Sequence, residues 1–335
     1  MFLTYLVVNN KYQNINQILK QEFNLSARLQ HKLILNKHVF LNSKIIDTRS
    51  SVLPNDVISV NLDFDEESEN IISTKMKINI VYEDDCFLIL NKPAGIATHP
   101  SLSHYKDSIS NGVKYYFESI GLNRKIRPIN RLDLNTSGLV IFAKNEYVQE
   151  CLIKQMQEKI FKKYYIAIVE GTFKSKIGTI NLPIARKENS IIERCVCQSG
   201  QTAITDYNVI STVNDLSIVE CILRTGRTHQ IRVHMSAIGH PLLGDTLYGN
   251  FSPLINRQAL HSHKLFFIHP ITNKVMNLKC NLPNDMNLIR TNKKNWKFFF
   301  DLFSPDLSFR LKGENLKGLA IVAFYIIGKY DFPII

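Results

Sequence analysis

The 335-residue chain has no apolar run long enough to cross a membrane. The longest candidate, Leu319 to Ile327, holds about half of the ~20 residues that a transmembrane helix needs. Residues 1–10 also lack the basic segment that opens a signal peptide. We therefore expect no membrane partner and a cytoplasmic location.

Cysteines are few, and none of the six forms a C-x-x-C pair. Cys195-x-Cys197 resembles half of a metal site, but a second half is missing, so we predict reduced thiols and no metal. His229 and His234 are five positions apart, which places them on no common helix or strand face, and we interpret them as satisfied polar groups or contacts to a binding partner rather than as metal ligands. The chain also lacks a P-loop and a Rossmann glycine fingerprint.

Acidic residues are scarce relative to basic ones: the chain has 29 Asp and Glu but 41 Lys and Arg, which gives a net charge of +12. The isoelectric point near 9.3 is typical of a nucleic-acid-binding domain, although an anionic membrane surface would attract the same charge. The length allows a catalytic domain and a smaller module.

Residues 1–62 have the pattern of a small αβ module. Helical spacing covers residues 15–23, and Ser26 is a suitable N-cap for a second helix over 27–35. Asn36 follows at a position where we expect a left-handed residue. A hairpin over 39–46 and a strand over 57–62 complete the order.

This order resembles the S-four type RNA-binding domain. In that family the second helix and the loop after it grip RNA phosphates, and the matching residues here are Arg28, Lys32 and Lys37. Each of them could instead belong to an ordinary solvated helix face. Residues 63–76 follow as an acidic linker, which we expect to be solvated and to avoid RNA.

A second domain is predicted over residues 77–300. It is rich in strands, begins with strands at 78–82 and 87–90, and contains a helix around 146–157. Residues 301–335 form a C-terminal tail to which the sequence assigns no role.

The segment Arg131-Leu132-Asp133-Leu134-Asn135-Thr136-Ser137-Gly138 combines an acid, a base and a turn. Arg131 and Asp133 point the same way in extended backbone, and the run from Leu139 to Ala143 reads as a strand buried on both faces. Asp133 is therefore expected at the edge of a rigid sheet, where a catalytic group is well positioned. An aspartate that merely closes an Asx-turn would be the ordinary alternative.

Three further blocks accompany this segment. They are Asn91-Lys92-Pro93-Ala94-Gly95, the alternating run 162–171 that matches K-x-Y-x-A-x-V-x-G, and the run 223–249. The last contains Thr225-Gly226-Arg227-Thr228-His229-Gln230-Ile231-Arg232-Val233-His234 and then Gly239-His240-Pro241 through Gly244-Asp245 to Tyr248-Gly249. Together the blocks resemble the RluA-type pseudouridine synthases over most of residues 78–270.

The resemblance implies an α+β protein in which the small module precedes a mixed, mainly antiparallel β-sheet domain with flanking helices, the pseudouridine synthase fold. It implies that Asp133 acts on the ribose, either by attacking C1′ or by removing the C2′ proton. It also implies that Arg232 pairs with Asp133 and that Tyr165 stacks on the base and assists C5 deprotonation. A buried carboxylate is disfavoured as an anion, and an arginine partner offsets this cost. The isomerisation needs no redox step or group carrier, so we predict no cofactor.

Arg131, Arg227 and His229 are candidates to hold the flipped nucleotide and its phosphates, although they could be structural pairs. Relatives commonly carry His where this chain has Asn130, and we interpret that change as structural because an amide can orient backbone through hydrogen bonds.

The predicted partner is structured RNA, most of all large-subunit (23S-type) ribosomal RNA, with transfer RNA as an alternative substrate, and the protein is expected to be a monomer. A non-catalytic ribosome assembly factor is the competing class, but it would be expected to have lost Asp133, Tyr165 or Arg232. A metal-dependent nuclease is disfavoured because clustered acidic ligands are not evident.

Overall fold

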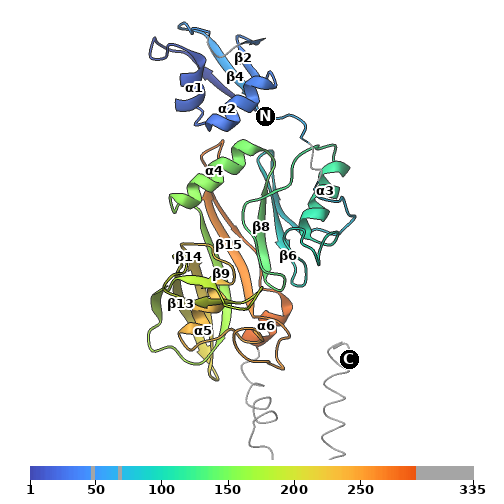
Figure 1. Cartoon of the computed structure of the whole chain (residues 1–335), viewed down its shortest axis with the longest axis vertical. Helices are drawn as coiled ribbons and strands as arrows, with labels where there is room; N and C mark the ends of the chain where they lie inside the picture. The colour runs from blue at the N-terminus through green and yellow to red at the C-terminus, as the bar shows by residue number, and fades with distance from the viewer. Residues whose placement is uncertain (47–49, 67–69, 292–335) are drawn as a thin grey trace, which may run out of the picture. The chain divides into compact units, whose positions relative to one another are not determined.

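The N-terminal module of the computed structural model contains two helices and a four-stranded antiparallel sheet (Figure 1). Its elements are β1 (Phe2–Leu6), α1 (Ile15–Gln21), α2 (Ala27–Leu35), β2 (Val39–Leu41), β3 (Lys44–Ile45) and β4 (Val57–Asn61), with strand order β1-β4-β2-β3. Apolar residues at helical spacing in α1 and α2 are fully buried beside Ile58 and Val60 of β4. The predicted helices, hairpin and last strand are present, and β1 was not predicted.

Helix α2 begins as the sequence indicated, because the Ser26 hydroxyl accepts a hydrogen bond from Leu29 N at 3.2 Å. The prediction of a left-handed Asn36 is wrong: Asn36 has φ −89° and Lys37 has φ +60°. Lys37 N donates to Ile34 O and His38 N donates to Leu33 O, the paired bonds of a Schellman motif. The motif places the left-handed residue one position beyond the helix cap.

Residues 1–46, 50–66 and 70–291 are described by the structure, so the tail 301–335 lies outside the described residues. Residues 1–289 belong to one unit. No helix among the described residues has the length and apolar character needed to cross a membrane.

The second domain is built on a ten-stranded mixed, mainly antiparallel sheet. The main path of the sheet is β10-β13-β14-β9-β15-β8-β6-β5, and β8 with β15 is its parallel pair. The bounds are β5 (Ile80–Glu83), β6 (Phe87–Lys92), β8 (Ser137–Ala143), β9 (Lys162–Glu170), β10 (Ile177–Asn181), β13 (Ile204–Val213), β14 (Leu216–Leu223) and β15 (Leu260–Ile268). Strand β7 (Arg127–Pro128) joins β8, β16 (Val275–Lys279) joins β15, and β11 (Ile184–Arg186) pairs separately with β12 (Arg194–Val196). The predicted α+β class is confirmed.

Strand β8 is buried along its whole length, as its apolar run predicted. Val140 and Phe142 belong to the same core cluster as residues of α3 (Ile109–Ser119), which lies beside β6 in Figure 1. Leu139 and Ile141 share the other cluster with residues of α4 (Glu146–Gln157). The alternation of side chains along a strand therefore gives each face of β8 its own helix.

The helix predicted around 146–157 is α4, with the same bounds. Helices α3, α5 (Gln230–Ala237) and α6 (Asn284–Thr291) were not predicted. Helix α5 is only eight residues long and its charged and apolar residues are mixed, so periodicity gives little signal there.

Gly138 begins the close approach of β8 to β15. Its φ is +115°, and a Cβ atom there would lie 2.3 Å from the carbonyl oxygen of Ser262. Only glycine fits this position, which explains why the turn after Asp133 ends in Ser137-Gly138.

The expectation that the acidic linker is solvated is wrong for Glu66. Its carboxylate is buried and accepts two hydrogen bonds from Arg127, both at 2.7 Å. Lys32 of α2 bonds the same carboxylate at 2.6 Å. The buried Arg127 thus anchors the segment at Glu66. Without this carboxylate the buried guanidinium would lose its partner, at a cost in folding free energy.

Candidate active site

Asp133 lines a cavity of about 860 Å³ just before the start of β8. The turn after it is closed by Thr136 N, which donates to Asp133 O at 3.1 Å, and the side chain of Asp133 is 26% exposed. Tyr165, Arg232 and His229 line the same cavity, together with Arg131 and Arg227. Segments separated by about a hundred positions therefore meet around one carboxylate.

Among the residues that the structure describes, Arg232 is the cation nearest to that carboxylate. Its Nη1 lies 3.5 Å from Asp133 Oδ2, so the predicted approach of these two residues is present. The tighter contact was not predicted: Arg232 Nε and Nη2 bind the two carboxylate oxygens of Asp245 at 2.7 and 2.8 Å. Arg232 projects from α5, and its guanidinium also lies over the Tyr248 ring, 5.0 Å from its centre.

Asp245 is almost fully buried and also accepts from Leu247 N at 3.1 Å and Tyr248 N at 3.3 Å. A two-pronged arginine–carboxylate pair fixes both the position and the plane of the guanidinium. Asp245 lies in the last sequence block, residues 223–249, but no role was predicted for it. The only signal was its place in that block.

His229 approaches the other carboxylate oxygen of Asp133. It has φ +57° at the start of α5, and its Nε2 lies 3.9 Å from Asp133 Oδ1. The Tyr248 hydroxyl accepts a hydrogen bond from Arg194 N at 2.8 Å and shares a second one with His229 Nδ1, also at 2.8 Å. Burial lowers the pKa of His229, with Asp133 acting in the opposite direction.

Tyr165 lies on β9 with 5% of its surface exposed. Burial, and then the charge of Asp133, raise its pKa well above the ordinary value for a phenol. The side chain is consequently a neutral phenol, suited to stack on a base and to donate a hydrogen bond. To act as a proton acceptor at C5 it would first have to lose this proton.

Arg131 and Arg227 are exposed where they line the cavity. Arg227 Nε donates to Thr202 O at 3.0 Å, a contact that orients the side chain while leaving it accessible. His234, by contrast, is buried and bonded to Thr205 Oγ1 and Leu182 O, both at 2.9 Å, so it is a satisfied polar group.

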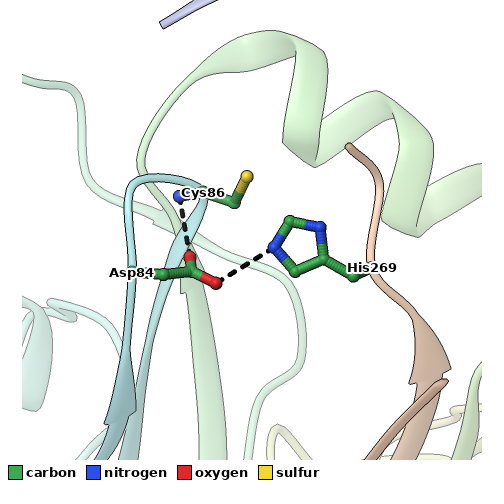
Figure 2. A group of neighbouring side chains, drawn as sticks. All are labelled: Asp84, Cys86 and His269. Carbon is green, nitrogen blue, oxygen red and sulfur yellow. Dashed lines mark hydrogen bonds and ion pairs between the residues drawn. The ribbon is translucent and has the colours of Figure 1, made fainter. Parts of the chain in front are cut away.

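Within residues 1–46, 50–66 and 70–291, one group of side chains has the spacing of a metal site: Asp84, Cys86 and His269 (Figure 2). His269 Nδ1 accepts from Ile271 N and Thr272 N, so its Nε2 carries the proton and donates to Asp84 Oδ2 at 3.0 Å. No histidine lone pair is left for a metal ion, and burial raises the pKa of Cys86 to about 12. The group is a hydrogen-bonded brace between the β5–β6 turn and the end of β15.

The arrangement around Asp133 agrees with comparisons to known proteins. The family model described as RNA pseudouridylate synthase matches residues 86–237. The Bacillus subtilis (strain 168) protein named uncharacterized RNA pseudouridine synthase YhcT is 38% identical over 291 residues, which cover 85% of this chain and 96% of that protein. The chain belongs to the RNA pseudouridine synthase family.

Two further relatives agree. Ribosomal large subunit pseudouridine synthase D of Blochmanniella floridana is 35% identical over 78% of this synthase and 88% of its own length. The solved structure of human RNA pseudouridylate synthase domain containing 1 superposes with a TM-score of 0.51 at 26% identity, covering 61% of this chain and 83% of that one.

The side chain of Asn130 in the synthase bonds to the backbone of β8. Its Nδ2 donates to Leu139 O and its Oδ1 accepts from Ile141 N, both at 3.0 Å. This supports the interpretation of Asn130 as a residue that orients the strand leading from Asp133.

Lys92 was quoted in the first block but given no role. It is fully buried, and its Nζ donates to Pro93 O at 2.8 Å, Ile96 O at 2.7 Å and Leu134 O at 3.0 Å. Burial lowers its pKa to about 7, while Asp133 acts in the opposite direction. Lys92 thus joins the backbone of residues 93–96 to Leu134, the residue after Asp133.

The N-terminal candidates for RNA contact have different surroundings. Lys37 is exposed, whereas Arg28 and Lys32 both pair with Glu146 of α4. Lys32 also pairs with Glu66, so contact with phosphate would require it to leave two carboxylates. The assignment of Arg28, Lys32 and Lys37 to RNA binding stays a prediction.

Proposed function

We propose that this synthase isomerises uridines in large-subunit ribosomal RNA and that Asp133 is the carboxylate that acts on the ribose. The observation that carries the proposal is the contact between Asp133 and Arg232 inside the cavity. Asp245 holds the other two nitrogens of the Arg232 guanidinium. Arg232 thus holds a positive charge beside the carboxylate that both candidate mechanisms use.

The reaction breaks the bond between ribose C1′ and N1 and forms one between C1′ and C5. The proton on C5 is lost and N1 gains one, so the isomerisation is balanced without an oxidant, a reductant or a carried group. Asp133 either attacks C1′ or removes the C2′ proton to give a glycal, and both routes use an ionised carboxylate. Tyr165 is proposed to stack on the base and to assist the proton transfer at C5.

The remaining charged residues are proposed to hold the RNA. Arg131, Arg227 and His229 line the cavity where a flipped nucleotide would enter, and Arg28, Lys32 and Lys37 belong to the proposed S-four type module. Phosphate contacts of this kind supply affinity and register rather than sequence readout. We propose that the synthase works as a monomer in the cytoplasm, where ribosomal RNA is its partner.

The ribosomal proposal is supported by relatives whose names specify the large ribosomal subunit. Transfer RNA is the alternative substrate, since nothing in the cavity distinguishes the two kinds of RNA. A non-catalytic assembly factor is disfavoured because Asp133, Tyr165 and Arg232 are all present and line one cavity.

The test is a transcriptome-wide map of pseudouridine in cells with and without the gene. The lost sites should lie in large-subunit ribosomal RNA and return with a wild-type copy but not with Asp133→Asn. Lost sites confined to transfer RNA would redirect the proposal to that substrate, and an unchanged map would refute the enzymatic proposal in those cells.

A further inference from the structure

We propose that Lys163 is the cation that stabilises the uracil when its bond to the ribose breaks and the base carries negative charge. The inference rests on the proposed function and specifies which side chain holds the detached base. Lys163 is the lysine of the K-x-Y pattern in the block 162–171, two residues before Tyr165. It lines the same cavity as Tyr165 and Asp133.

Both routes open to Asp133 leave the base with the electron pair of the broken C1′–N1 bond. Displacement at C1′ and elimination through C2′ each release uracil as an anion, whose charge is shared among N1, O2 and O4. The bond between C1′ and C5 then forms, C5 loses its proton and N1 gains one, and in the elimination route Asp133 also returns a proton to C2′. A positive charge fixed beside the base lowers the barrier to the first step, because negative charge develops there in the transition state.

Five arginine and lysine side chains line the cavity: Arg131, Lys163, Arg224, Arg227 and Arg232. Arg224 and Arg232 are each paired with a carboxylate, and Arg227 donates to a backbone carbonyl. Arg131 is exposed, and water weakens the effect of its charge. Among the residues that the structure describes, Lys163 is therefore the one of the five that is both partly buried and without a bonded partner.

Strand β9 directs Lys163 and Tyr165 into the cavity together. The two residues are two positions apart in the strand, so their side chains leave the same face of the sheet. Lys163 lies between Leu223 of β14 and Leu265 of β15, its partners in the neighbouring strands. Since Tyr165 is proposed to stack on the uracil, the lysine beside it is placed to approach the same base.

The ammonium group of Lys163 is held where its charge is poorly solvated. No carboxylate in the described part of the chain pairs with it, and burial lowers its pKa. A cation in such surroundings raises the energy of the free enzyme, and an anion that arrives beside it removes this cost. Because Asp133 already has its own cation in Arg232, the negative charge that Lys163 is placed to meet belongs to the substrate.

The loop against which Lys163 lies is fixed by hydrogen bonds. A Cβ atom on Gly226 would lie 3.3 Å from Lys163 Nζ, so the ammonium reaches this loop. Thr225 Oγ1 donates to Gln230 Oε1 at 2.8 Å, and Arg227 N donates to the same oxygen at 3.0 Å. A cation bounded by a strand and a fixed loop is preorganised, which is what stabilisation of a developing charge requires.

An RNA phosphate is the other anion that a lysine can bind. Phosphates lie on the outside of RNA, where the exposed Arg131 and Arg227 suit them. Lys163 is instead partly buried on the strand that carries Tyr165, and this position favours the base over the backbone.

The test uses an RNA segment that the wild-type synthase modifies. With saturating enzyme in a single turnover, Lys163→Met should slow pseudouridine formation about tenfold or more while changing RNA affinity less than about twofold, because the anion exists only after the bond begins to break. Lys163→Arg should recover part of the rate, since it restores the charge. Lys162→Met is the matched control: Lys162 is exposed, leaves the opposite face of β9, and should be replaceable without loss of rate.

Two altered RNAs identify the anion. 5-Fluorouracil leaves as a more stable anion than uracil, because fluorine withdraws electrons. The rate deficit of Lys163→Met should therefore shrink when the target is 5-fluorouridine and its disappearance from nuclease digests is followed. On RNA whose target ribose lacks a base, Lys163→Met and wild type should bind equally.

Three results would overturn the proposal. An affinity deficit of Lys163→Met that persists on the RNA without a target base would assign Lys163 to a phosphate. An equal rate deficit on uridine and 5-fluorouridine would show that Lys163 does not act on the leaving base, and an unchanged rate on uridine would remove it from the reaction. Failure of the proposed function would look different, as absence of wild-type product from every ribosomal RNA segment.

Discussion

Arg232 contacts two carboxylates, and the one it holds more tightly is Asp245 rather than Asp133. The Asp245 oxygens accept from Nε and Nη2 at 2.7 and 2.8 Å, whereas Nη1 lies 3.5 Å from Asp133. The buried carboxylate fixes the guanidinium, and the remaining nitrogen faces the proposed catalytic group. We therefore propose that Asp245 is a positioning residue that acts on Asp133 through Arg232.

This geometry predicts which second substitution compensates for loss of Arg232. Arg232→Met should destabilise the protein by about 3–5 kcal/mol, because it leaves Asp245 buried without its cation. Adding Asp245→Asn should recover part of that loss, since the stranded charge is gone. Adding Asp133→Leu should recover little, because Asp133 is partly exposed. Urea unfolding of the three proteins measures these differences. Recovery of stability on adding Asp133→Leu but not on adding Asp245→Asn would contradict the prediction.

Asp245→Asn by itself should reduce kcat about tenfold or more while RNA affinity changes little, because a neutral amide holds the guanidinium less firmly near Asp133. Asp285→Asn is the control, since Asp285 binds Arg257 by the same two-pronged geometry at 2.7 and 3.0 Å and lies outside the cavity lining. Single-turnover and binding assays on both variants separate positioning from general stability. Equal effects from the two substitutions would argue against a special role for Asp245.

The buried pair of Glu66 and Arg127 can be tested by truncating the chain on either side of Glu66. A protein comprising residues 63–335 keeps the Glu66–Arg127 pair, whereas one comprising residues 71–335 leaves Arg127 buried with only Glu146, at 4.0 Å. The longer protein should have the higher melting temperature, because the shorter one loses the carboxylates that pair with two buried arginines, Glu66 with Arg127 and Asp63 with Arg124. Indistinguishable melting curves would show that this pair contributes nothing to stability.

Both truncated proteins should bind RNA more weakly than the full chain at low salt, if Arg28, Lys32 and Lys37 contact phosphates. The deficit should shrink as salt rises, since phosphate contacts contribute less there. Filter binding over a salt series measures it. Equal affinity of truncated and full-length proteins at low salt would remove the module from the RNA interface.

Lys92 predicts a particular pH dependence. Its pKa falls from 10.5 in the unfolded chain to about 7 in the folded protein because of burial. Between those values the unfolded state binds more protons, so the free energy of unfolding gains a contribution that rises with pH from about 7 and levels off near 10.5. The wild type should show this rise relative to Lys92→Met in unfolding measurements between pH 6 and 10. A pH-independent difference between the two would show that Lys92 keeps its proton.

Much of the site could be predicted from the sequence, because its residues lie in a few contiguous sequence segments. The turn after Asp133, the buried strand β8 and helix α4 were predicted from local patterns, and the approach of Arg232 to Asp133 across 99 positions followed from the family resemblance. Asp245, Tyr248 and Lys92 were missed as site residues because their roles are three-dimensional contacts with no local pattern. Helix α5 was missed because eight residues of mixed character carry little periodicity. The exact left-handed position after α2 depends on where the helix ends, which sequence fixes only to within a residue or two.

The most direct test of the central claim is Asp133→Asn in the purified synthase, assayed on a ribosomal RNA segment that the wild type modifies, with EDTA and no added cofactor. The amide preserves the shape of the side chain but removes the charge that acts on the ribose. We predict full wild-type turnover under these conditions, no pseudouridine from the variant, and RNA affinities within a few-fold of each other, because Asp133 is proposed to act on the sugar rather than on phosphate. Substantial pseudouridine formation by Asp133→Asn would contradict the account.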